Sequence, residues 1–148
     1  MEKVIATRSV TNTTLYATLL LRIGLGLLFL AHAAVKLFVF TVPGFVGYFA
    51  SLGLPAVFAY ATLALEVAGG LCLVLGIYAP LVCLPLIGEL LGTIVMEHGK
   101  HGFVFSNPGG GWEFPALWAL ALVVLSLLGD GPFALRPMRR GSIWSFLG

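Results

Sequence analysis

Charged residues are scarce in this sequence: Asp, Glu, Lys and Arg make up only 9% of the 148 residues, and the mean hydropathy is +1.05. A soluble domain carries about 25% charged residues, so the chain has too few charges to build a water-facing surface. We therefore expect the lipid bilayer to be its main surroundings. The chain also lacks a basic run of the kind that tracks a phosphate backbone, which argues against nucleic-acid partners.

Motifs that hold redox centres are missing as well. Cys72 and Cys83 are the two cysteines, and no CxxC motif occurs, which disfavours a thioredoxin-type or structural zinc site. A disulfide between them could form but is not favoured, because a lone cysteine usually packs as a small apolar residue. Ligand motifs for haem, flavin or iron–sulfur clusters are also lacking, so electrons would have to come from a partner or a soluble donor.

What the sequence does contain is four long apolar segments, each bounded by proline or glycine. Crossing a bilayer takes about 20 apolar residues, and the first segment is too long for a signal-peptide core, so we expect it to be a retained helix. The third and fourth segments are short for a full span. The predicted helices cover residues 15–40, 56–77, 81–98 and 114–129.

Basic residues outside these segments predict the orientation. Lys3 and Arg8 precede the first segment and three arginines follow the fourth, whereas the loops on the opposite side contain only Lys100. Because positive loops face the cytoplasm, both termini should be cytoplasmic, with a tail over 130–148. The prediction is one all-α domain over 1–148, a polytopic four-helix membrane bundle that crosses the plasma membrane (in a bacterium, the inner membrane) several times.

The loop over residues 41–55 carries no charge and is crowded with aromatic residues, among them Phe45, Tyr48 and Phe49. Aromatic rings favour the depth of the lipid headgroups, so this segment should lie in the interface. Two interpretations remain open: it is a simple aromatic belt, or it covers a hydrophobic ligand site.

Ionisable residues inside the spans are the most informative feature. Arg22, His32 and Lys36 lie on one face of the first helix, and Glu66 and Glu89 lie near the middle of the second and third. A charge in the bilayer centre costs at least about 2.5–3.5 kcal/mol, so we expect Arg22 and Lys36 to pair with the two glutamates. The network could hold the helices in register or form a functional site, and intramembrane charges favour the second.

His32 has two interpretations of equal weight, as a ligand or proton carrier and as a helix–helix hydrogen bonder. Glycines suggest close packing at Gly26 and at Gly69–Gly70, and Gly88 and Gly92 form a weaker GxxxG signal for helix contact. A polar rim at the outer face holds Glu97, His98, His101 and Glu113. Its spacing matches no strong zinc pattern, so we predict no metal site.

These residues, in this order, resemble the DoxX family of membrane proteins across residues 15–130. The first-helix match is carried by Leu21–Gly26, His32 and Lys36-Leu37; later matches are carried by Phe49–Pro55, Glu66, Gly69-Gly70, Leu75-Gly76, His101–Phe103 and Gly110–Glu113. In the family pattern a glycine and a glutamine stand where this chain has Ala33 and Val35. Glu89 is not a residue that we associate with the family.

The resemblance implies a four-helix membrane subunit, and some similar proteins act in quinone-linked oxidation, including the larger subunit of a thiosulfate:quinone oxidoreductase. We therefore expect a quinone-linked redox subunit with no covalent cofactor, acting as an oxidoreductase subunit with a partner protein if it is an enzyme. The predicted catalytic residues are His32, Lys36 and Glu66; the predicted ligand-binding residues are Arg22, Glu89, Glu113, Trp112 and Phe49.

Two other functions fit the same sequence. In the first, the chain is a non-catalytic membrane anchor or assembly factor of a redox complex, and its buried charges set packing and partner choice. In the second it is a small proton-coupled transporter, with Glu66 and Glu89 as coupling groups. Because four spans without an internal repeat are few for a carrier, the second would require a homo-oligomer.

Overall fold

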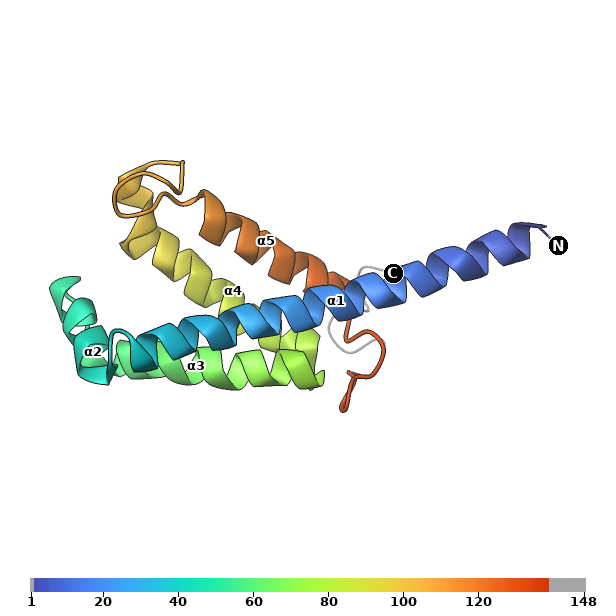
Figure 1. Cartoon of the computed structure of the whole chain (residues 1–148), viewed down its shortest axis with the longest axis horizontal. Coiled ribbons are helices and arrows are strands. Elements are labelled where there is room, and N and C mark those ends of the chain that lie inside the picture. Colours follow the sequence, from blue (N-terminus) through green and yellow to red (C-terminus); the bar gives the residue numbers. More distant parts are fainter. Residues whose placement is uncertain (1, 139–148) are drawn as a thin grey trace.

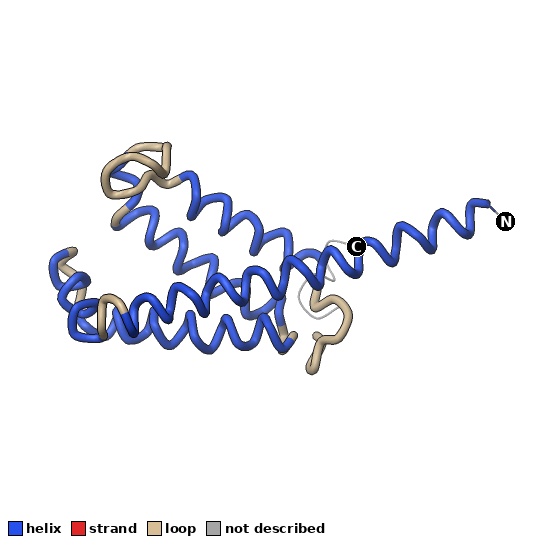
Figure 2. The backbone as a smooth tube through the Cα atoms, viewed as in Figure 1, coloured by secondary structure: helices blue, strands red, loops and turns tan. Residues whose placement is uncertain are grey.

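The computed structural model describes residues 2–138, with side chains from Asn12 onward, and its long regular elements are all helices. Figure 1 shows the elements, and Figure 2 distinguishes the helices from the loops, the most prominent of which precedes α5. The helices are α1 (Glu2–Phe38), α2 (Val42–Ser51), α3 (Ala56–Leu75), α4 (Ala79–Met96) and α5 (Glu113–Leu128), with a short 3-10 helix, η1 (His98–His101), after α4. All four predicted helices are confirmed, and the predicted interfacial loop contains an additional helix, α2.

The observed bounds differ from the predicted ones mainly at the ends. α1 begins at Glu2, well before the apolar run, and its membrane-spanning part covers Asn12–Phe38. That segment, α3 and α4 are each long and apolar enough to cross a membrane. α5 has 16 residues, which is about 24 Å of helix and is short, as expected. Of the predicted tail, residues 139–148 lie outside the part that the structure describes.

The helices associate as two pairs, α1 with α3 and α4 with α5. Figure 1 shows that the pairs converge at the α3–α4 turn and diverge toward the end that carries α2 and η1. The apolar core lies between the pairs and includes Phe29, Leu73, Cys83, Leu86 and Leu122, all fully buried. Both cysteines are free.

Glycine allows α1 and α3 to approach closely, as predicted. A Cβ added at Gly26 would lie 2.8 Å from the carbonyl oxygen of Gly70, and one at Gly70 would lie 3.0 Å from that of Gly26. The expected contact through the other glycine pair is wrong: Gly88 and Gly92 are exposed, and no described atom lies within 4 Å of where their Cβ would be. They line a cavity instead.

Arg22 holds the converging ends of the helices together, which corrects the prediction that it pairs with a glutamate. Its buried guanidinium donates to the carbonyl oxygens of Leu73 (2.9 Å), Val74 (3.2 Å) and Pro132 (3.1 Å). Among the described residues it makes no ion pair. The last carbonyls of a helix have no partner within it and carry partial negative charge, and Arg22 meets them about 10 Å along α3 from Glu66.

Asp130 binds the backbone at the start of α4. Its Oδ1 accepts a hydrogen bond from the backbone N–H of Ala79 (2.7 Å) and its Oδ2 one from Met138 (2.8 Å). The segment that follows α5 then runs beside the α3–α4 turn, where Leu135 donates to Leu75 and Arg136 to Gly76. A buried base and a buried acid thus supply hydrogen bonds to backbone groups at this turn.

The glycine crossing can be tested with two substitutions on the same helix. Gly26→Ala should lower the stability of the folded protein by about 1–3 kcal/mol, because the added methyl group forces α1 and α3 apart. Gly24→Ala is the matched control, since its Cβ would meet no atom within 4 Å. Thermal unfolding in lipid nanodiscs measures both, and an equal effect of the two changes would contradict the proposed crossing.

Candidate functional site

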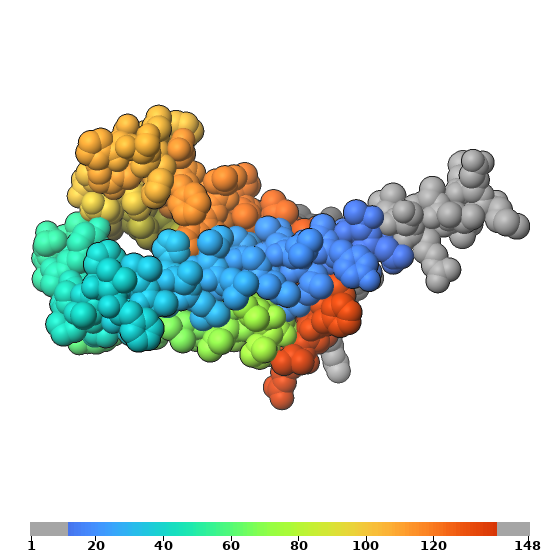
Figure 3. Space-filling view, in the orientation of Figure 1, coloured from blue at the N-terminus to red at the C-terminus, as the bar shows by residue number. Residues whose placement is uncertain are grey.

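A cavity of ≈ 610 Å³ lies between the two diverging helix pairs. Figure 3 shows α2 and the region after α4 as neighbouring lobes at this end of the molecule. Every helix contributes to the wall, and α2 covers one side, which agrees with the ligand-covering interpretation of the aromatic segment. The principal lining residues are His32, Lys36, Phe45, Tyr48, Phe49, Phe58, Thr62, Glu66, Glu89, Thr93, Glu97, Phe105, Phe114 and Trp118.

An ion pair between α1 and α3 lies at this cavity. The ammonium group of Lys36 donates a hydrogen bond to Oε1 of Glu66, and the Glu66 side chain is almost fully buried. The same ammonium lies 5.3 Å from the ring centre of Phe45 on α2, in a cation–π arrangement. The predicted neutralisation of a first-helix base by a second-helix acid is therefore confirmed for Lys36.

Glu89 from α4 joins this pair. Its carboxyl group interacts with both Glu66 and Lys36, although the cation bonds directly only to Glu66. Within the described part of the chain, the Oε2 atoms of Glu66 and Glu89 are buried and have no hydrogen-bond donor. Three helices thus bring one base and two acids together at one place.

His32 lies beside this group on α1. Its Nδ1 is 3.0 Å from the carbonyl oxygen of Leu28 in the same helix, and its ring is 4.8 Å from that of Trp118 on α5. A carbonyl oxygen only accepts, so Nδ1 carries the proton and Nε2 of the neutral ring is an acceptor. The hydrogen bond lies within α1, so the helix–helix interpretation of His32 is not supported.

Aromatic side chains form much of the remaining wall. Phe49, one of the predicted ligand-binding residues, lines the cavity and packs edge-on against Phe45 at 4.9 Å. On the opposite side, Phe114 packs against Trp118 at 5.8 Å. Sequence reasoning did not single out Trp118; the signal that could have found it is its place one helical turn after Phe114, on the same face.

Three of the predicted ligand-binding residues do not line the cavity. Arg22 lies at the α3–α4 turn. Trp112 packs edge-on against Phe103 at 4.8 Å, and Glu113 accepts a hydrogen bond from the backbone N–H of Phe105 at 3.0 Å. The last two hold the loop before α5 in shape, which places Phe105 in the wall.

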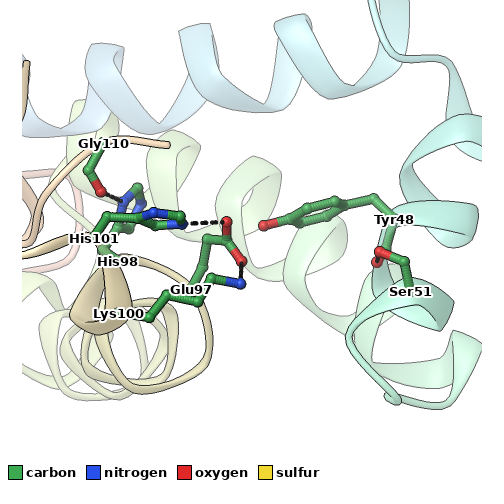
Figure 4. Close-up of polar contacts among 7 residues, drawn as sticks. All are labelled: Tyr48, Ser51, Glu97, His98, Lys100, His101 and Gly110. Atoms are coloured by element: carbon green, nitrogen blue, oxygen red, sulfur yellow. Dashed lines mark hydrogen bonds and ion pairs between the residues drawn. The ribbon is translucent and has the colours of Figure 1, made fainter. Parts of the chain in front are cut away.

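Polar side chains at the end of α4 and in η1 form a rim beside the cavity, and Figure 4 shows their contacts. Glu97 accepts hydrogen bonds from Lys100 (2.8 Å) and His101 (3.2 Å). The hydroxyl group of Tyr48, on α2, points toward the same carboxylate, so this contact links α2 to the end of α4. Because both histidines of the rim have such partners (His98 bonds to the carbonyl of Gly110 at 2.7 Å), the rim is a hydrogen-bonded network. No group of three metal-ligating side chains occurs among the described residues.

The charges of the rim shift two pKa values in opposite directions. The hydrogen bond from Lys100 is the main reason that the pKa of Glu97 lies below its usual value. Burial, followed by the negative charge of Glu97, raises the pKa of Tyr48 to about 12. Tyr48 therefore stays protonated, and able to donate toward Glu97, throughout the physiological pH range.

Alkaline titration tests this link between α2 and α4. The absorbance of tyrosinate in the intact protein should include a component that ionises near pH 12, and Tyr48→Phe should remove it. Glu97→Gln should move that component to lower pH, because the negative charge opposing ionisation is gone. If Tyr48→Phe leaves the titration curve unchanged above pH 11, about a unit above the ordinary tyrosine pKa, the contact is not as described.

The fold and the site define a class of protein: a helical membrane bundle with a buried ion pair beside an aromatic cavity. The sequence profile of the DoxX family matches residues 17–99. The protein named "Putative oxidoreductase CatD" of Bacillus subtilis (strain 168) is 32% identical over 120 residues, which cover 81% of this chain and 84% of that protein. The chain belongs to the DoxX family. No solved structure matches it.

Proposed function

We propose that this protein is the quinone-linked membrane subunit of a redox system and that its cavity binds a quinone-type ring. The observation that carries the proposal is the Lys36–Glu66 ion pair at an aromatic cavity of ≈ 610 Å³. Ligand sites in proteins commonly have about 300–1,000 Å³ and combine apolar walls with a few polar groups. The DoxX family and a relative named as an oxidoreductase support a membrane redox role.

The polar groups of the cavity suit a ring that alternates between carbonyl and hydroxyl oxygens. The Lys36 ammonium has three N–H donors and uses one on Glu66, so another can bind a ring carbonyl. When its ring is neutral, His32 offers Nε2 as an acceptor for a ring hydroxyl. The aromatic side chains, Phe49 and Trp118 among them, provide surfaces on which a flat ring can stack.

A bound quinone would supply chemistry that couples electron uptake to proton uptake. The electrons would come from a partner protein or a soluble donor. The protein's own residues would orient the ring, exclude water and exchange protons at Lys36 and His32. With both termini cytoplasmic in the plasma membrane, α2 and the rim would lie at the outer face, and the cavity in the outer half of the bundle.

Ligand binding by neutralised variants tests this proposal. A short-chain benzoquinone or its quinol, titrated by calorimetry into the protein in nanodiscs, should bind the intact chain. The double variant Lys36→Met/Glu66→Gln should bind at least about tenfold more weakly, because a hydrogen bond to a charged group contributes about 1.5–3 kcal/mol. Removing both charges together avoids leaving one of them buried without its partner.

Two further variants sharpen the test. His32→Ala should weaken binding of the quinol more than that of the quinone, since Nε2 accepts from a hydroxyl. Lys100→Met is the matched control, because Lys100 carries the same charge outside the cavity, on the exposed rim. Equal affinity of the double variant and the intact protein would refute the site. An intact chain that binds neither ring but co-purifies with a stoichiometric soluble partner would support the membrane-anchor function instead.

A further inference from the structure

The two glutamates beside Lys36 raise a problem that the ion pair alone does not solve. Glu66 is 3% exposed, and the carboxyl groups of Glu66 and Glu89 lie within hydrogen-bonding reach of each other. Each has one oxygen, Oε2, that is hidden from solvent and has no donor among the described residues. A buried acceptor without a donor costs about 1–3 kcal/mol, and more when it is charged.

The chemistry of carboxyl groups limits how this can be resolved. An ionised carboxylate only accepts hydrogen bonds, so two carboxylates cannot bond to each other unless a proton lies between them. Two buried carboxylates in contact generally share one proton for this reason. With that proton, one carboxyl group becomes a donor, and the other can accept from it.

Charge counting leads to the same result. Lys36 contributes one positive charge against two acids, so full ionisation would leave one net negative charge inside the membrane, where it is costly. The other ionisable groups that line the cavity have hydrogen-bond partners of their own, outside this group of three. His32 on α1 donates through Nδ1 to Leu28, and Tyr48 on α2 points to Glu97. Glu97, just after α4, and His98, in η1, are held within the rim network.

We infer that Glu66 and Glu89 share one proton, so that Lys36, Glu66 and Glu89 together form a neutral, proton-holding site. This inference goes beyond the proposed function, because it concerns the protein without any ligand. The carboxylate partner of Lys36 thereby also becomes the acceptor of the shared proton. Glu89, which the family resemblance does not account for, is the residue that makes proton storage possible in this chain.

Infrared spectroscopy of the ligand-free protein in nanodiscs tests the inference. At neutral pH the spectrum should contain the C=O stretching band of a protonated carboxylic acid, with the expected shift in deuterated water. Glu89→Gln should abolish the band. Glu113→Gln is the matched control and should leave it unchanged, because that side chain lies outside the cavity and accepts a backbone hydrogen bond.

Isotope labelling keeps the test valid even if a variant fails to fold. In the unmodified chain, carboxyl-labelled glutamate should shift the band, and labelled aspartate should not, since Asp130 lies at the α3–α4 turn, where it accepts two backbone hydrogen bonds. Absence of the band at neutral pH would overturn the inference. So would a band that survives Glu89→Gln, or one that disappears when Na⁺ replaces choline in the buffer, which would place a cation between the carboxylates. None of these outcomes depends on quinone binding.

Discussion

Hydrogen bonding at the α3–α4 turn is the constraint on which the rest of the molecule depends. The backbone groups at helix ends have no partner within their own helix, and here one helix ends and the next begins within a few residues. Arg22 takes up the carbonyls that end α3, and Asp130 takes the N–H group that begins α4. With this end fixed, the two helix pairs can diverge at the other end and leave room for a cavity.

The number and approximate bounds of the long helices could be predicted from the sequence. The length of an apolar segment and the prolines and glycines that bound it are local signals. The glycine contact between α1 and α3 followed the same logic. What could not be predicted is which polar group meets which neighbour. A helical wheel places Arg22 and Lys36 on one face, but it gives neither the tilt nor the axial offset of the facing helix. Lys36 therefore meets Glu66 as expected, while Arg22 meets backbone carbonyls.

The contrast between local signals and three-dimensional packing also explains which residues of the site could be predicted from the sequence. Five of the predicted site residues line the cavity: His32, Lys36, Glu66, Glu89 and Phe49. The first four could be found because they interrupt apolar helices, and the fifth because it stands in an aromatic run. Trp112 and Glu113 belong to an irregular loop, where no period relates sequence to direction. Trp118 escaped notice for the opposite reason, since a tryptophan in an apolar helix looks like any other core residue.

The short length of α5 has a consequence for the surrounding lipid. The spanning part of α1 has 27 residues, and α5 has 16, so their hydrophobic lengths differ by roughly 16 Å. Such a mismatch is met by tilting the long helix and thinning the bilayer beside the short one. The hydrocarbon layer next to α5 would then be thinner than in the surrounding bilayer. The thickness of the surrounding bilayer should therefore affect the tilt of α1 relative to α5.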